Sequence, residues 1–172
     1  WADVIVNNQD LGDTNNSNST GGTGTRGLFA GGYNPSPSPG ACTDTVDYIT
    51  IETLGNSQDF GNLVDARHVG GQLSDRTRAV YAGGRGPTTP GGSDTANITF
   101  TTIASTGNYA DSNGDLSAAV GVRGTSNSTR GLFGSTFFPY TDTIEYVTIQ
   151  SLGNAVDFGN LTEVRGYGMA LS

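Results

Sequence analysis

The chain has 172 residues, of which 34% are hydrophobic and 27 are glycine, and its formal net charge at pH 7 is −8. The eight basic residues are all arginine and form no cluster, which argues against binding to nucleic-acid phosphates or anionic lipid. No apolar run is long enough to span a membrane as a helix, so membrane insertion is not expected. The apolar residues fall in short runs rich in Val, Ile, Tyr and Phe, without the spacing of an amphipathic helix. We therefore predict an all-β protein.

One phrase of the sequence returns at a fixed interval. TRGLFAGG begins at Thr25, TRAVYAGG at Thr77 and TRGLFGS at Thr129, so each copy starts 52 residues after the previous one. The segments between also correspond, with Asp-Thr pairs at 44, 94 and 142 and Gly-Asn pairs at 55, 107 and 153. We divide the chain into a partial unit at 1–24 and units at 25–76, 77–128 and 129–172, the last one truncated at its end.

Each complete unit is predicted to hold three or four short strands separated by turns. In the first unit, RGLFAGG is a short apolar strand that ends in a glycine pair and leads into a loop rich in Pro, Gly and Ser. An alternating strand follows, with Val46 and Tyr48 on one face. SQDFGNL is predicted to be a turn, and Val69 and Leu73 indicate a last strand.

Units of about 50 residues with this content are typical of β-propeller blades. In detail they resemble the kelch motif, in which a strand ending in Gly-Gly and a variable loop are followed by two aromatic residues and an arginine. The corresponding positions are Gly31-Gly32 and Gly83-Gly84, then Tyr48, Phe100 and Tyr146, then Phe60 and Phe158, and finally Arg67, Arg123 and Arg165. Gly134-Ser135 replaces the glycine pair in the third unit, and Phe stands where kelch usually has Trp, so the repeat is a divergent kelch-like one.

The kelch resemblance implies an incomplete ring of about three and a third blades, because propellers close with four to eight. We favour the view that this chain is one piece of a longer protein, and the alternative is that copies of the chain assemble. Contact with other chains is expected, because terminal blades expose apolar faces and strand edges. Within the ring, Arg26, Arg78 and Arg130 are expected to bond to carbonyl groups between blades, or to pair with Asp44, Asp94 and Asp142.

The third unit carries a narrower resemblance. DTIEYVTIQSLGNAVDFGNLTEVRG at 142–166 and SNSTRGLFG at 126–134 are similar to repeat proteins encoded by bacteriophages of marine cyanobacteria. That family is described as virion structural or tail-associated proteins. The resemblance implies a non-enzymatic virion component, on the tail or capsid, that serves in particle assembly or host-surface attachment. The alternative is a bacterial extracellular adhesin or carbohydrate-binding propeller module.

Residues typical of catalysis are few. Cys42 is the only cysteine in the sequence and His68 the only histidine, which excludes a metal triad of histidines within one chain. We interpret Cys42 as incidental, because no histidine lies near it in the sequence, and His68 as a solvated or packed side chain. With no G-x-S-x-G motif either, the chain is predicted not to be an enzyme.

The segment DSNGD resembles a calcium loop faintly, since Asp111, Asn113 and Asp115 alternate as oxygen ligands around a glycine. It lacks the later Gly and Glu of an EF-hand loop. An ordinary polar turn is therefore the favoured interpretation, and no cofactor is predicted, with Ca²⁺ as the alternative at this segment.

Three loops differ in sequence while the segments around them repeat: YNPSPSPGACT, RGPTTPGGS and TFFPYT. A rigid scaffold presents changeable contacts in this way, and we expect all three loops on one face of the propeller. Their candidate residues for binding a sugar ring or a protein partner are Tyr33, Arg85, Phe137, Phe138 and Tyr140. For TFFPY the alternative is a hydrophobic plug between blades or against a neighbouring subunit. The expected partners are other virion proteins, copies of the chain or host surface polysaccharide.

Overall fold

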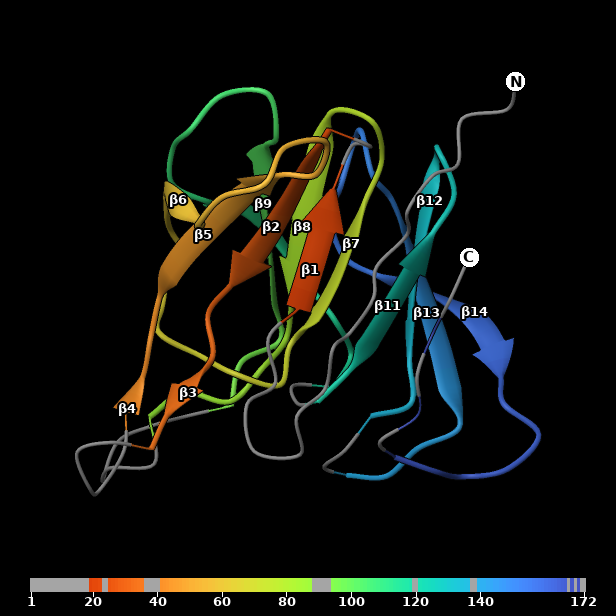
Figure 1. Ribbon diagram of the computed structural model, residues 1–172. Coiled ribbons are helices and arrows are strands. Elements are labelled where there is room, and N and C mark those ends of the chain that lie inside the picture. Colours follow the sequence, from red (N-terminus) through yellow and green to blue (C-terminus); the bar gives the residue numbers. More distant parts are fainter. Residues whose placement is uncertain are drawn as a thin grey trace.

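In the computed structural model, the described residues are 19–22, 25–35, 41–87, 94–118, 121–136, 139–166, 168 and 170. They form strands and turns and contain no helix, so the prediction of an all-β protein is confirmed. Most of the strands make up three four-stranded antiparallel sheets (Figure 1). A short hairpin, β3 (Tyr33–Asn34) with β4 (Ala41–Cys42), extends from the first sheet.

Each sheet is assembled from strands that follow one another in the chain, except that the β3–β4 hairpin lies between β2 and β5 of the first sheet. The first consists of β1 (Ser19–Gly22), β2 (Arg26–Ala30), β5 (Thr45–Thr50) and β6 (Gln58–Asn62), in that order. The second consists of β7 (Gly71–Ser74), β8 (Arg78–Ala82), β9 (Asn97–Thr102) and β10 (Ala110–Asp115). The third consists of β11 (Arg123–Ser126), β12 (Arg130–Gly134), β13 (Thr143–Thr148) and β14 (Val156–Asn160). The first strands of the sheets lie together, β1 against β7 and β7 against β11.

The sheets are offset from the repeat units of the sequence. Strand β7 stands at the end of the unit 25–76 but pairs with β8 of the following unit. This strand begins at Gly71, so the prediction that Val69 is part of it is wrong. Val69 has a φ of 55°, a left-handed conformation that a β-branched residue rarely adopts, and this conformation interrupts the strand. Arg123 likewise does not match Arg67: it opens β11 opposite Gly134, just as Gly71 opens β7 opposite Ala82.

The segment SQDFGNL, predicted to be a turn, contains strand β6. A register shift occurs between Val46 and Asp47 on the neighbouring strand β5. Gly61, on β6, has a φ of 148° that glycine tolerates. The irregular pairing hides the period-2 pattern by which strands are recognised. DSNGD also lies in an edge strand, β10, rather than in a turn, with a register shift between Asp111 and Gly114.

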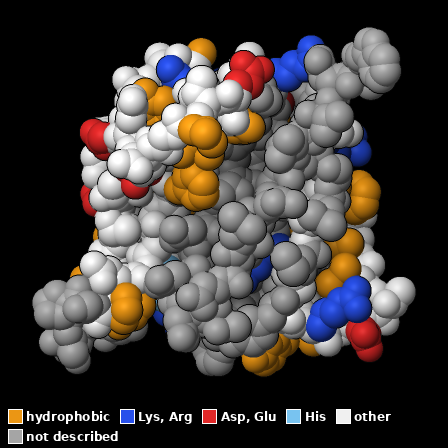
Figure 2. Space-filling model, in the orientation of Figure 1, with side chains coloured by type: hydrophobic (Ala, Val, Ile, Leu, Met, Phe, Trp, Pro, Cys, Tyr) orange, Lys and Arg blue, Asp and Glu red, His pale blue; other side chains and the backbone are white. Residues whose placement is uncertain are grey.

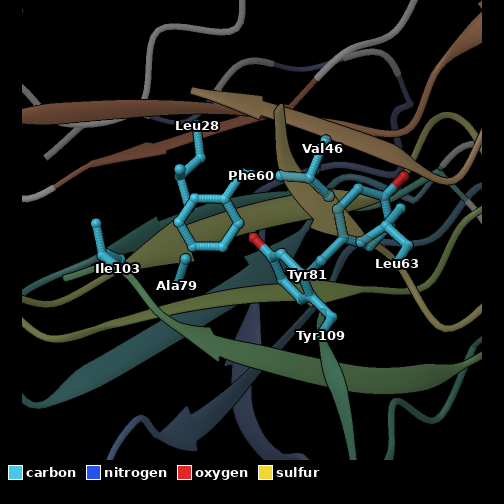
Figure 3. Packing of buried hydrophobic residues seen from close by; sticks show 9 residues of the cluster. Leu28, Val46, Phe60, Leu63, Ala79, Tyr81, Ile103 and Tyr109 are labelled. Carbon is cyan, nitrogen blue, oxygen red and sulfur yellow. The ribbon is translucent and has the colours of Figure 1, made fainter. Parts of the chain in front are cut away.

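Two hydrophobic cores lie between successive sheets. In the first core, Leu28, Val46 and Phe60 of the first sheet pack against Tyr81 and Ile103 of the second (Figure 3). The second core joins the opposite face of the second sheet to the third and contains Leu73, Val80, Ala82, Ile98, Leu116, Val122, Phe133, Val147 and Ile149. The second sheet is thus covered on both faces, whereas the first and third sheets each pack against a described neighbour on one face.

The repeated arginines link the sheets through backbone carbonyls. Arg26 Nη1 donates to Ile103 O at 2.8 Å, and Arg78 Nη1 donates to Ile149 O at 2.8 Å. Each guanidinium also lies over the central aromatic ring of its own sheet, 4.8 Å from the ring centre of Tyr48 and 4.6 Å from that of Phe100. The expectation of carbonyl partners is therefore confirmed for these two arginines, while Asp94 pairs with Arg85 instead.

The Gly-Asn pairs also link neighbouring sheets, at the outer strands. Asn108 Oδ1 accepts a hydrogen bond from the backbone N–H of Asn62 at 3.0 Å, and Asn154 Oδ1 accepts one from Asp115 N–H at 3.1 Å. The pair at 107–108 thus binds strand β6 of the preceding sheet, and the pair at 153–154 binds strand β10. Each pair satisfies edge-strand groups that would otherwise face solvent.

Asp75 joins the turn between β7 and β8 to the third sheet. Its carboxylate accepts hydrogen bonds from the backbone N–H groups of Thr77 and Arg78, from the Thr77 hydroxyl and from the Gln150 amide. Burial alone would raise the pKa of this carboxyl, but the four hydrogen bonds stabilise the charged form and lower the pKa below its ordinary value.

We therefore expect the stability of the protein to fall in acid partly through Asp75. A depressed folded-state pKa contributes stability that is complete above the unfolded-state pKa and is lost as the pH falls through the lower folded-state value. Thermal melting from pH 6 to pH 2 should show a steeper loss of Tm for the wild type than for Asp75→Asn, which carries no titrating group there. Parallel curves would contradict this role.

Candidate functional site

The described residues that flank the three variable loops lie at one end of the molecule. Figure 1 shows the described segments that follow β2, β8 and β12 at its lower end. The first two loops meet there, because Arg85 pairs in antiparallel bridges with both His68 and Asp94, and His68 lies beside the β3–β4 hairpin. The loop after β12 contains Tyr140, whose ring lies so close to Gly166 that a Cβ there would meet it at 2.6 Å.

A polar cluster joins the first two loops, and we call Tyr33, Cys42, His68, Arg85 and Asp94 the loop-end cluster. Cys42 Sγ lies 3.2 Å from His68 Nδ1, which is also 3.0 Å from the carbonyl oxygen of Arg85. The Tyr33 and His68 rings are tilted against each other with centres 5.6 Å apart. Arg85 Nε donates to Asp94 Oδ1 at 2.9 Å. Backbone bridges and side-chain contacts thus hold the five residues together.

Cys42 lies beside a histidine in space, although no histidine lies near it in the sequence. His68 is distant in sequence but is in contact with the thiol, because the β3–β4 hairpin folds back onto the residues that precede β7. The two residues are 26 positions apart and share no periodic pattern, so no sequence signal could have paired them. His68 itself is half-buried and packed, and a packed side chain was one of the two environments predicted for it.

The protonation states of this pair follow from burial. Desolvation raises the pKa of the Cys42 thiol and lowers the pKa of the His68 imidazole, although the hydrogen bond to the Arg85 carbonyl opposes the latter shift. Both directions favour the neutral thiol and the neutral imidazole at pH 7. A nucleophilic cysteine needs the opposite arrangement, a thiolate beside an imidazolium. The pair therefore has the contact of a catalytic dyad but not its electrostatics.

We expect Cys42 to react slowly with iodoacetamide at neutral pH. The rate should rise only as the pH exceeds the ordinary pKa of a cysteine, because the raised pKa of Cys42 keeps the thiolate scarce. The unfolded chain in urea provides the control and should react faster at pH 7. A fast rate at pH 7 that disappears in His68→Ala would show that the imidazole activates the thiol. That result would contradict the neutral protonation states inferred for Cys42 and His68.

The predicted binding residues lie in different places. Tyr33 and Arg85 come together through His68, whereas Tyr140 lies in the third loop with 52% of its surface exposed. Phe137 and Phe138 lie outside the described residues. The loop-end cluster adds three residues that sequence reasoning had not included in the binding site, namely Cys42, His68 and Asp94.

The proposed calcium ligands form hydrogen bonds within or beside strand β10. Asp111 Oδ1 accepts from Asn113 N–H at 2.8 Å, and the backbone of Asp115 bonds to residues of the third sheet. Asn113 has a φ of 58°, a conformation that Asn tolerates better than most residues, and this conformation forms part of the bulge. In the described part of the chain, no three His, Cys, Asp or Glu side chains are grouped closely enough to hold a metal ion.

A shallow open depression lies beside the cluster on the first sheet. It is lined by Phe29, Gly31, Gly32, Tyr33, Asn34, Thr43, Thr45 and Asp47. The aromatic rings of Phe29 and Tyr33 provide apolar surface, and Asp47 provides a carboxylate. The depression can therefore receive a group that combines an apolar stem with a positive charge.

No protein-family model matches the sequence, and no curated protein matches it. Across the described segments, no helix has the length and apolar character needed to cross a membrane.

Proposed function

We propose that the chain is a non-enzymatic binding module of a phage virion, built as a segment of a kelch-like propeller. The observation that carries this proposal is that the described residues flanking the three variable loops lie at one end of three repeating sheets. A rigid sheet scaffold holds such loops in place while their sequences change. The similarity of 142–166 to virion repeat proteins of cyanobacterial phages supports the location on the particle.

The chemistry of the loop end suits a carbohydrate ligand. Tyr33 and Tyr140 supply aromatic faces on which sugar rings stack, and the Arg85–Asp94 pair supplies hydrogen-bond donors and acceptors for hydroxyl groups. The raised pKa of Cys42 and the lowered pKa of His68 both favour neutral side chains, which suits binding rather than nucleophilic catalysis. Attachment to a host surface polysaccharide is the role that these features support best.

A glycan array of bacterial surface polysaccharides tests this function. We expect binding that Tyr140→Ser weakens about tenfold, which corresponds to roughly 1.4 kcal/mol. Val156→Ser is the matched control, because Val156 on β14 is also 52% exposed. Absence of binding across the array would remove the attachment role and leave assembly as the function. Copurification with cells instead of phage particles would favour a bacterial adhesin.

A further inference from the structure

The outer face of the third sheet repeats an interface that the first two sheets bury. Phe158 and Leu161 stand on β14 and just after it, as Phe60 and Leu63 do for β6. Phe60 is 2% exposed because the second sheet covers it, whereas Phe158 is 52% exposed. We call this outer surface of the third sheet the carboxy-terminal face; it comprises Leu132, Ile144, Tyr146, Phe158 and Leu161 together with Arg130, Gly159 and Arg165.

Gly159 indicates what this face accommodates. A Cβ at Gly61 would lie 2.5 Å from Gly107 O, and one at Gly114 would lie 2.1 Å from the carbonyl carbon of Gly153. Glycine at these two positions thus admits the Gly-Asn pair of the next sheet. Gly159 occupies the equivalent position, but nothing in the described chain lies within 4 Å of a Cβ there. The face therefore retains the space for a Gly-Asn pair that no described residue fills.

Two arginines on the carboxy-terminal face lack the inter-sheet contacts that their counterparts make in the described part of the chain. Arg130 lies over Tyr146 at 4.7 Å, as Arg26 lies over Tyr48, but its guanidinium reaches no carbonyl of another described sheet. Arg165 is the counterpart of Arg67, because each follows its outer strand by five residues. Arg67 is fully buried, lies over the Tyr81 ring and donates to Gly83 O at 3.2 Å. The Arg165 side chain is 50% exposed.

The opposite end of the array offers the complementary features. On the first sheet, Ile51 is 41% exposed, whereas its counterparts Ile103 and Ile149 are fully buried. All three are placed alike, since their N–H groups donate to Thr25, Thr77 and Thr129 respectively. Figure 2 shows hydrophobic side chains facing the viewer over β2 and β5. We call this surface the amino-terminal face; it comprises Phe29, Ile49, Ile51, Gly55, Asn56 and the depression.

We propose that the carboxy-terminal face of one chain binds the amino-terminal face of a second copy of this chain. Each contact that the carboxy-terminal face lacks has a matching group on the amino-terminal face. By analogy with the two internal interfaces, Arg130 would donate to the carbonyl of Ile51, and the Gly55-Asn56 pair would lie against Gly159. The exposed Phe158 and Ile51 would cover each other.

The charges also match across this interface. Arg67 reaches the Tyr81 ring and Gly83, and the corresponding residues of the first sheet are Phe29 and Gly31, both of which line the depression. Asp47 stands in the depression opposite Phe29, where the second sheet has Thr99 opposite Tyr81. The Asp47 carboxylate gives the depression a negative charge that suits the guanidinium of Arg165. The interface around Arg67 has no carboxylate at this position, because Thr99 stands there.

The association is head-to-tail, because two different faces meet. Such contacts close into a ring if the rotation between copies allows, and otherwise extend into a chain. Two copies with three four-stranded sheets each supply six sheets, a number within the range of closed propellers. Closure would cover both free faces of each copy.

Analytical ultracentrifugation and native mass spectrometry of the purified full chain test the proposal. At up to about 100 µM, which would detect a weak interface, we expect assemblies with at least twice the 17.7 kDa mass of the chain. Phe158→Asp and Ile51→Asp each place a charge on one face only, and each variant should be monomeric. Because each variant keeps one intact face, an equimolar mixture of the two should form a dimer.

The mixture distinguishes this arrangement from others. A symmetric dimer through the carboxy-terminal face alone would leave Ile51→Asp dimeric, which would overturn the proposal. A monomeric wild type would also overturn it, and would assign the free faces to a different partner such as further repeats. A closed dimer and a longer head-to-tail assembly both support the pairing of the two faces, provided that both variants abolish it.

Asn56 and Asn154 provide a matched pair of substitutions. Asn154→Ala removes a hydrogen bond inside the chain and should lower Tm without abolishing association. Asn56 is exposed in the single chain, so Asn56→Ala should leave the Tm of the monomeric chain unchanged and weaken association several-fold. Equal association of wild type and Asn56→Ala would contradict the placement of the Gly-Asn pair in the interface.

Discussion

We expect Phe60→Ala to lower the free energy of unfolding by about 3–5 kcal/mol, which is the cost of removing a fully buried aromatic side chain. Phe60 packs edge-on against Tyr48 with ring centres 6.1 Å apart and faces Tyr81 and Ile103 of the second sheet. Its removal leaves a cavity between two sheets that the backbone cannot easily close. Urea unfolding followed by circular dichroism measures the change.

Phe158→Ala is the matched control for this substitution. Phe158 makes the same edge-on contact with Tyr146, also at 6.1 Å, but no described sheet covers its other side. We expect a loss of about 1 kcal/mol at most, measured at low protein concentration so that association does not contribute. Similar losses for the two variants would show that the inter-sheet core contributes little to stability, contrary to the packing observed.

Gly61→Ala is expected to destabilise the protein by at least about 2 kcal/mol more than Gly159→Ala. The new Cβ at position 61 would lie 2.5 Å from Gly107 O, so the first two sheets would have to separate locally. The hydrogen bonds from Gly107 N–H to Phe60 O and from Tyr109 N–H to Asn62 O would weaken as a result. Thermal unfolding at a fixed heating rate gives the comparison.

The comparison works because the two glycines share a backbone conformation. Gly61 has a φ of 148° and Gly159 a φ of 142°, so alanine is strained at both positions to a similar degree. Only Gly61 meets a neighbouring sheet. If the two variants lost equal stability, backbone strain alone would explain the effect, and the close approach of the sheets at Gly61 would be unimportant.

Two of the five residues of the loop-end cluster, Tyr33 and Arg85, were named from the sequence, and the reason is the repeat. The variable loops were recognised because their flanks return every 52 residues, and the structure brings the first two together through Tyr33, His68 and Arg85. The contact of Cys42 with His68 was not accessible. It depends on a hairpin whose strands have two residues each and on the chain reversal before β7, neither of which leaves a periodic pattern.

Strands were predictable where apolar side chains alternate or form a short run, and were missed where Gly, Asn and Asp replace them. Strand β2 is a short apolar run and β5 carries alternating apolar residues, and both were expected, whereas β6 and β10 contain Gly, Asn and Asp and were predicted to be turns. Outer strands tolerate these residues because one of their edges is free of sheet pairing. Bulges and glycines with positive φ there are compatible with the strand but suppress the alternation on which sequence reasoning depends.

The sequence by itself determined the all-β class, the interval of the repeat and the positions of its arginines and glycines, because these depend on local pattern and on comparison between copies. Only the tertiary structure decided what each repeated residue does. Identical positions differ in environment, as Phe60 and Phe158 or Gly61 and Gly159 show, because burial depends on whether a neighbouring sheet is present. That presence is a property of the assembled array and is encoded in no single repeat.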